Sequence, residues 1–167
     1  PRTRMILFNN PVNPTGIAYT KEEVAAIAAV AKKHNVLLVS DEIYSAFIYD
    51  FPHESMIRHY ENTILVGGFS KTYAIAGWRL GFAAGPEDII NKMSMMQQFS
   101  YVCAPSAAQV AGITALDLDM SSYIEPYKQK RDMVYEGLKD NFEVVRPQGA
   151  FYIFPKCPRP EQTMIRR

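Results

Sequence analysis

The segment VLLVSDEIY at residues 36–44 decides the fold. It begins with a continuous apolar run, and such runs are typical of parallel strands that are covered on both faces. Similar short runs occur before it, at residues 4–9 (RMILFN), and after it, at residues 63–66 (TILV). The three runs predict three strands of one buried sheet.

A helix is predicted between the first two strands. Thr20 and Glu23 have the spacing of a capping box at its start. Its apolar side chains recur at helical spacing: Val24, Ile27, Ala28 and Ala31. Because strand and helix alternate through the first half, we expect an α/β protein with part of a mainly parallel sheet flanked by helices.

The second half is richer in helix. A strand is predicted at residues 78–84. Three helices are predicted to follow, at residues 86–101, from residue 106 onward and at residues 122–138, and then a terminal hairpin of residues 142–145 and 150–154. Phe151 and Tyr152 are expected in the core of that hairpin. The group Met93, Met95 and Met96 is expected to pack against a core or a domain interface.

Composition excludes several classes of partner. The 167 residues carry 18 basic and 17 acidic side chains and no run of like charge, so neither nucleic acid nor an anionic membrane has an electrostatic footprint. The longest strongly apolar stretch, residues 24–31, is too short to cross a bilayer. Cys103 and Cys157 have no metal-ligand or redox spacing and predict reduced thiols. No targeting segment is visible, so we expect a cytoplasmic protein. His34, His53 and His59 form no metal-ligand cluster, so no metal site is expected.

Polar residues follow each of the three predicted strands. Asn13 comes shortly after the first, Asp41 ends the second, and Lys71 follows the third. Ligands of open parallel sheets bind beyond the carboxyl ends of the strands. Three separate segments are therefore predicted to meet in one crevice.

Lys71 and Arg79 suggest the chemistry of that crevice. A neutral lysine amine at a strand end is a nucleophile toward carbonyl groups. The planar guanidinium of Arg79 suits a phosphate. The pair predicts a carbonyl cofactor that is tethered at Lys71 and anchored by its phosphate.

Taken one at a time, these residues have ordinary structural explanations. Most lysines lie on the surface, Asp41 could cap a helix, Arg79 could form an ion pair and Asn13 could form a turn. Tyr44 could be a core aromatic residue. Only their joint placement after successive strands favours a functional site.

The combined motifs resemble those of the class I and II aminotransferases, which are fold type I pyridoxal phosphate enzymes. The matching segments are residues 13–16 (NPTG), residues 41–44 (DEIY), and residues 70–71 (SK) with Arg79. Their order and approximate spacing also match, and the resemblance covers residues 4–154.

The resemblance implies a role for each residue toward pyridoxal 5'-phosphate. Lys71 would carry the cofactor as a Schiff base and move the substrate proton. Asp41 would face the pyridine nitrogen. Tyr44 and Asn13 would donate to the phenolic oxygen of the cofactor.

Ser70 and Arg79 would hold the phosphate. Many relatives carry a further small hydroxyl residue at the place of Gly68. One side-chain contact to the phosphate is therefore expected to be missing.

The resemblance also implies amino acid and 2-oxo acid substrates and a homodimer in the complete protein. It predicts that the chain is a fragment: residues 1–120 would be the later part of the cofactor-binding large domain, and residues 121–167 the start of the small domain. We expect exposed apolar edges and little or no activity in the isolated piece. A carbon–sulfur lyase and a regulator that borrows the aminotransferase fold for its effector domain remain alternatives.

Overall fold

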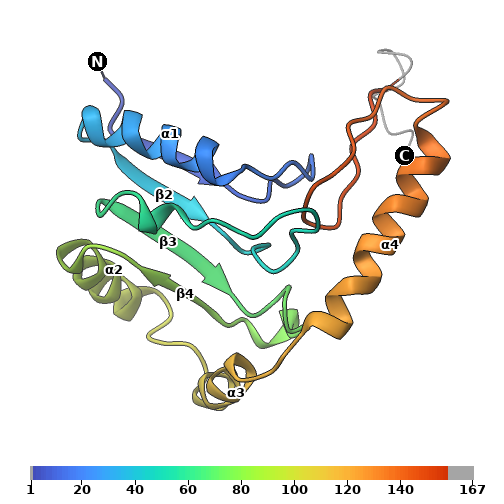
Figure 1. Ribbon diagram of the computed structural model, residues 1–167. Coiled ribbons are helices and arrows are strands. Elements are labelled where there is room, and N and C mark those ends of the chain that lie inside the picture. The colour runs from blue at the N-terminus through green and yellow to red at the C-terminus, as the bar shows by residue number, and fades with distance from the viewer. Residues whose placement is uncertain (1, 158–167) are drawn as a thin grey trace.

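The structure, a computed structural model, describes residues 2–157. Four strands form one sheet in the order β1-β2-β3-β4 (Figure 1). The first three run parallel, and β4 runs antiparallel to β3. The strands are β1 (Met5–Asn9), β2 (Leu37–Asp41), β3 (Thr63–Gly68) and β4 (Gly81–Ala84). The predicted α/β fold with a mainly parallel sheet is confirmed.

Helix α1 (Lys21–Lys33) begins at the predicted capping box. The Thr20 hydroxyl accepts from the Glu23 amide at 3.3 Å, and the Glu23 carboxylate accepts from the Thr20 amide at 2.8 Å. One side of α1 is buried in the largest apolar cluster, whose members are Phe8, Val24, Ala28, Ala31, Leu38, Met56 and Tyr60. This packing fixes α1 against the sheet and sets where the loop after β1 can run.

Two further helices follow β4. Helix α3 (Ser106–Leu116) buries Ala108 and Ala115 against Phe69 and Leu80. None of the residues of α2 (Glu87–Ser100), all within the described range, is buried. Its methionines are exposed: Met93, Met95 and Met96. Packing of this group against a core is therefore wrong for the described residues, while packing at an interface stays a prediction.

The strand predicted from residue 78 begins later than expected. Residues Ala76–Trp78 form a short 3-10 helix, η2, and Arg79 has a left-handed backbone with φ of 53°. A residue in that conformation cannot continue an extended ladder, so β4 starts only at Gly81.

The segment after α4 (Ser121–Leu138) does not form the predicted hairpin. A single backbone bond joins its two halves, from the Lys156 amide to the Glu143 carbonyl at 2.8 Å. The amides of residues 148–150 bond to other loops: Gln148 and Gly149 donate to the Gly16 carbonyl at 2.8 and 2.9 Å, and Ala150 donates to the Phe47 carbonyl at 2.7 Å. The loop after β1 and the loop after β2 thus replace the partner strand. The boundary between the two predicted domains stays a prediction.

Gly16 permits the closest of these contacts. Its φ is 71°, and a Cβ atom there would lie 2.6 Å from the Cβ of Pro147 and 2.8 Å from the Tyr152 carbonyl oxygen. A side chain would therefore push the returning segment away from the loop after β1.

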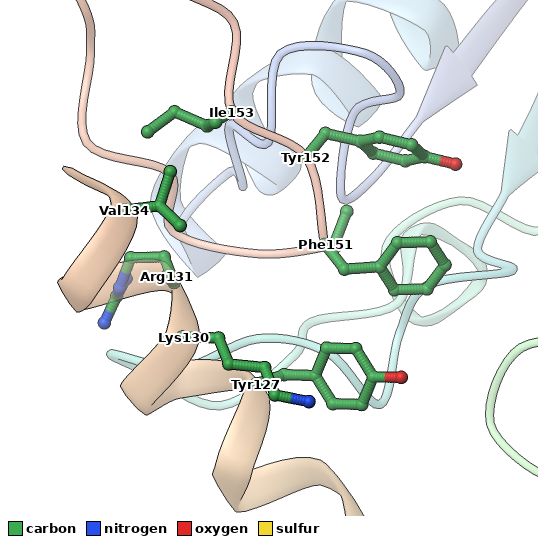
Figure 2. Close-up of a pocket in the computed structure, with 8 residues that line it drawn as sticks. Tyr127, Lys130, Arg131, Val134, Phe151, Tyr152 and Ile153 are labelled. Carbon is green, nitrogen blue, oxygen red and sulfur yellow. The ribbon is translucent and has the colours of Figure 1, made fainter. Parts of the chain in front are cut away.

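Helix α4 is tied to the loop after β2 by Arg131, whose guanidinium contacts both Asp50 carboxylate oxygens at 2.9 and 3.1 Å. A pocket of about 230 Å³ lies between α4 and residues 150–153 (Figure 2). The rings of Tyr127 and Phe151 pack at 5.8 Å between centroids on its wall. Within residues 2–157, no helix is long and apolar enough to cross a membrane.

Candidate active site

The carboxyl ends of β1, β2 and β3 lie at one edge of the sheet, and the segment after α4 passes the same edge (Figure 1). The register pairs Asn9 with Asp41, and Asp41 with Val66. The strands therefore end at nearly the same level, and the loops that carry Asn13 and Lys71 start on either side of Asp41.

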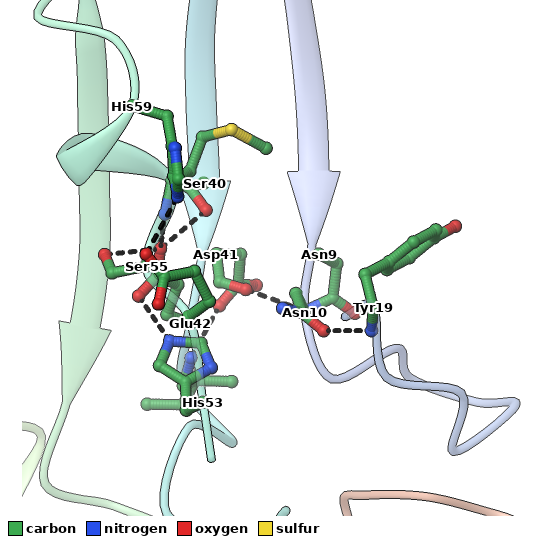
Figure 3. Close-up of polar contacts among 12 residues, drawn as sticks. Asn9, Asn10, Tyr19, Ser40, Asp41, Glu42, His53, Ser55 and His59 are labelled. Carbon is green, nitrogen blue, oxygen red and sulfur yellow. Dashed lines mark hydrogen bonds and ion pairs between the residues drawn. The ribbon is translucent and has the colours of Figure 1, made fainter. Parts of the chain in front are cut away.

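Asn9 links the first two strand ends (Figure 3). Its side-chain amide donates to the Asp41 carbonyl at 3.0 Å, and its side-chain oxygen accepts from the Asn13 amide at 2.8 Å. The Asn10 amide also donates to the Asp41 carbonyl at 3.0 Å. One Asp41 carboxylate oxygen, Oδ1, accepts from the Ile43 amide at 3.1 Å. These bonds fix the backbone on both sides of the predicted cofactor carboxylate.

Glu42, next to Asp41, is buried among hydrogen-bond donors (Figure 3). Its carboxylate accepts from the hydroxyls of Ser40 and Ser55 at 2.9 and 3.0 Å and from the Met56 amide at 3.1 Å, and it contacts His53 Nε2 at 2.8 Å. Burial opposes its charge, but the bonds with His53, Ser40 and Ser55 outweigh burial and hold the pKa of Glu42 below its usual value. Glu42 therefore anchors the chain directly after Asp41.

Lys71 and Tyr44 lie together. The Lys71 Nζ atom is 5.7 Å from the centroid of the Tyr44 ring and 5.8 Å from that of Phe151. The Tyr44 ring packs edge-on against both Phe151 and Tyr152, at 5.2 and 5.5 Å between centroids. The hydroxyls of Tyr44 and Tyr152 are 2.5 Å apart. The Lys71 amine and the hydrogen-bonded phenols of Tyr44 and Tyr152 thus lie close together at the sheet edge.

Ser70 and Arg79 make no hydrogen bond or ring contact with Lys71, Tyr44 or the aromatic residues beside them within residues 2–157. The exposed Arg79 guanidinium donates to the carbonyl of Ala76 at 3.0 Å, within its own turn. No hydrogen bond, ion pair or ring contact among residues 2–157 connects Ser70 or Arg79 with Lys71. The structure brings together Lys71 and Tyr44 and links the backbones of Asn13 and Asp41 through Asn9. The phosphate contacts of Ser70 and Arg79 stay a prediction.

Sequence reasoning missed Asn9, Phe151 and Tyr152 as neighbours of the site. Asn9 is the last residue of a strand and belongs to the Asn9–Asn10 pair before a proline, which is the one local signal for it. Phe151 and Tyr152 were expected in a hairpin core, and no local signal predicts their contact with Tyr44, more than 100 positions earlier. Among the described residues, no three histidine, cysteine, aspartate or glutamate side chains form a metal site.

The fold is a mainly parallel α/β sheet with polar residues at its strand ends, and comparison with known proteins shows to which family such a chain belongs. The family profile "Aminotransferase class I and II" matches residues 1–166. The chain belongs to the class I and II aminotransferase family.

Individual relatives agree with this assignment. The chain is similar to a probable aspartate aminotransferase of Methanocaldococcus jannaschii, at 42% identity over 92% of the chain and 44% of that protein. It is similar to a probable N-acetyl-LL-diaminopimelate aminotransferase of Bacillus subtilis, at 39% identity over 93% of the chain and 41% of that protein. A solved aromatic aminotransferase of Pyrococcus horikoshii superimposes with a TM-score of 0.87 at 39% identity, covering 92% and 44% of the two chains. The chain spans less than half the length of these relatives.

Proposed function

We propose that this sheet edge binds pyridoxal 5'-phosphate and that the protein transfers amino groups between an amino acid and a 2-oxo acid. The observation that carries the proposal is the contact of Lys71 Nζ with the Tyr44 ring at 5.7 Å, beside the strand end of Asp41, in a chain of the aminotransferase family.

The side chains present fit this cofactor by their chemistry. Lys71 supplies an amine for the aldehyde, Asp41 a carboxylate for a protonated pyridine nitrogen, and Tyr44 a phenol donor for the phenolic oxygen. The Asp41 Oδ2 atom has no hydrogen-bond partner among residues 2–157, so it is available to such a cation. Arg79 supplies an exposed guanidinium for phosphate, with Ser70 on the same loop.

Bound pyridoxal phosphate supplies an electron sink for charge that develops on the substrate Cα. The residues of this chain orient that group and move protons. Asp41, held through Oδ1 by the Ile43 amide, presents a fixed negative charge. The Lys71 amine would accept the proton from the substrate Cα. Tyr44 and Asn13 would donate hydrogen bonds to the phenolic oxygen of the cofactor and so favour its ionised form.

The test is reductive trapping. The polypeptide that carries these residues is incubated with pyridoxal phosphate, reduced with borohydride and mapped by peptide mass spectrometry. A pyridoxyl group confined to Lys71 is the expected result. Lys71→Ala should abolish the adduct, while Lys92→Ala, on the exposed side of α2, should leave it unchanged. A scattered adduct, or one that survives in Lys71→Ala, would refute the role of Lys71.

Product analysis then tests the reaction. The proposal expects a new amino acid from the 2-oxo acid, whereas release of ammonia and pyruvate from a sulfur amino acid would indicate a lyase. The relatives are named for aspartate, N-acetyl-LL-diaminopimelate and aromatic amino acids, so a panel of donors is required. We expect the 167-residue chain alone to show little or no turnover.

The proposal includes a second copy of the protein as partner and a cytoplasmic location. Large apolar side chains are exposed on the last turns of α2 and on α3, namely Met96, Phe99, Val110, Ile113 and Leu116. Such a patch is typical of a protein interface. Sedimentation of the 167-residue chain should show self-association. A compact, soluble monomer would contradict the proposed homodimer.

A further inference from the structure

Tyr152 has a hydroxyl beside the site that no role above uses. The two hydroxyls of Tyr152 and Tyr44 are 2.5 Å apart, and their rings pack edge-on at 5.5 Å between centroids. A phenol has one proton to donate and can also accept. Two phenols at this distance therefore share one hydrogen bond, in which one donates and the other accepts.

The backbone holds Tyr152 firmly in this place. Gln148 and Gly149 bond to the Gly16 carbonyl, Ala150 bonds to the Phe47 carbonyl at 2.7 Å, and Ala150 is fully buried. These bonds come from the loops that carry Asn13 and Tyr44. The Tyr152 hydroxyl is thus placed by the same segments that place the predicted cofactor contacts.

We propose that Tyr152 is a positioning residue whose hydroxyl donates to the Tyr44 hydroxyl and so directs the Tyr44 proton toward the phenolic oxygen of the cofactor. This inference rests on the proposed function. A hydroxyl that accepts a hydrogen bond donates a stronger one, because chains of such bonds polarise one another. Tyr152 thereby strengthens the contact of Tyr44 without touching the cofactor itself.

The acid–base behaviour of Tyr152 agrees with a donor role. The hydrogen bond with Tyr44, followed by burial, raises the pKa of Tyr152, and the nearby charge of Lys71 opposes this rise. Tyr152 therefore keeps its proton at neutral pH, as a donor must.

The first measurement needs no cofactor. With tyrosines labelled by ¹³C at Cζ, NMR titration should show a lower midpoint for Tyr152 in Tyr44→Phe than in the wild type, because the acceptor is gone. An unchanged midpoint would show that the two hydroxyls are not paired and would overturn the inference.

The second measurement is the pH at which the absorbance of bound pyridoxal phosphate changes. Tyr152→Phe should raise that midpoint by roughly 0.3 pH unit, a fraction of the shift in Tyr44→Phe. In the double variant, Tyr152→Phe should add nothing, since it acts only through Tyr44. Tyr123→Phe, at an exposed position of α4, is the matched control and should shift nothing.

The outcomes separate the two claims. A wild type that shows no titration of bound cofactor overturns the proposed function and this inference with it. A normal wild type with no shift, or a downward shift, in Tyr152→Phe overturns the role of Tyr152 alone. A Tyr152→Phe effect that persists in the Tyr44→Phe background also overturns it, because Tyr152 would then act independently.

Discussion

Asn9 and Asp41 lie opposite each other at the ends of β1 and β2, and the Asn9 side-chain amide donates to the Asp41 carbonyl at 3.0 Å. The same side chain accepts from the Asn13 amide at 2.8 Å. One amide group thus holds the backbone of two predicted cofactor residues. Its role is positional, because neither bond uses the Asp41 carboxylate or the Asn13 side chain.

Asn9→Ala should weaken both the fold and the affinity for pyridoxal phosphate. Two hydrogen bonds are lost, each contributing about 0.5–1.5 kcal/mol, so the free energy of unfolding should fall by about 1–3 kcal/mol. Denaturant unfolding and fluorescence titration with pyridoxal phosphate measure the two effects. Asn91→Ala, on the exposed side of α2, is the control and should leave both values nearly unchanged. Equal cofactor affinity in Asn9→Ala and wild type would contradict the positional role.

Glu42→Gln should lower the free energy of unfolding at neutral pH and make that free energy less dependent on pH in the acidic range. A group with a lowered folded pKa stabilises the protein above its unfolded pKa, about 4.5 here, and loses that contribution as pH falls through the folded pKa. At pH 7 we expect a loss of about 1–3 kcal/mol, because glutamine turns a donor toward groups that need an acceptor.

The measurement compares unfolding free energies of wild type and Glu42→Gln at several pH values from 7 down to 3.5. The difference between them should shrink below pH 4.5. Glu125→Gln, exposed on α4, supplies the matched charge change and should show no such trend. A difference that is independent of pH would show that the Glu42 charge contributes nothing.

Arg131→Met should be strongly destabilising. Arg131 is buried, contacts both Asp50 oxygens and donates to the Pro147 carbonyl. Removing one partner of a buried ion pair costs about 3–5 kcal/mol. We expect the lower end of this range, because Asp50 is partly exposed and keeps a contact with Arg146 at 3.7 Å. The hydrogen bond from Arg131 also holds the pKa of Asp50 below its usual value, so that pKa should rise in the variant.

Urea unfolding checks the stability of Arg131→Met, and NMR titration checks the Asp50 carboxyl. Arg146→Met is the control: its side chain is about half exposed and its contact with Asp132 is screened by solvent, so its effect should stay below about 1 kcal/mol. Similar losses for both arginines would contradict the special place of Arg131 between α4 and the loop after β2.

The sequence predicted what short-range patterns determine. The apolar runs gave the three parallel strands, and the spacing of Thr20 and Glu23 gave the start of α1. Because parallel strands end at one edge, the loops that carry Asn13 and Lys71 were also expected to start on either side of Asp41, as they do.

Backbone hydrogen bonds between distant segments could not be predicted from the sequence. The apolar run at residues 150–154 suits a strand of a hairpin. The carbonyls of Gly16 and Phe47, more than 100 positions earlier, instead accept from the amides of residues 148–150. The role of Asn9 depends on which residue faces it across the ladder, and that register exists only in the assembled sheet. Likewise, the left-handed conformation of Arg79 is set by its turn and not by its residue type.

Tyr49→Phe should test how the segment that carries Tyr152 is anchored. The Tyr49 hydroxyl donates to the Ala150 carbonyl. Burial raises the pKa of Tyr49 to about 12, against an opposing effect of the Arg131 charge and a smaller rise from Tyr127. A group with a raised folded pKa contributes its full stability below the unfolded pKa, here 10, and loses it as pH rises through the folded pKa. The free energy of unfolding of Tyr49→Phe should therefore be about 1 kcal/mol lower than that of the wild type, both at pH 7 and at pH 9. This difference should decrease between pH 10 and 12. Tyr123→Phe should match the wild type at every pH, and a Tyr49→Phe protein that does the same would show that this hydroxyl does not hold Ala150 in place.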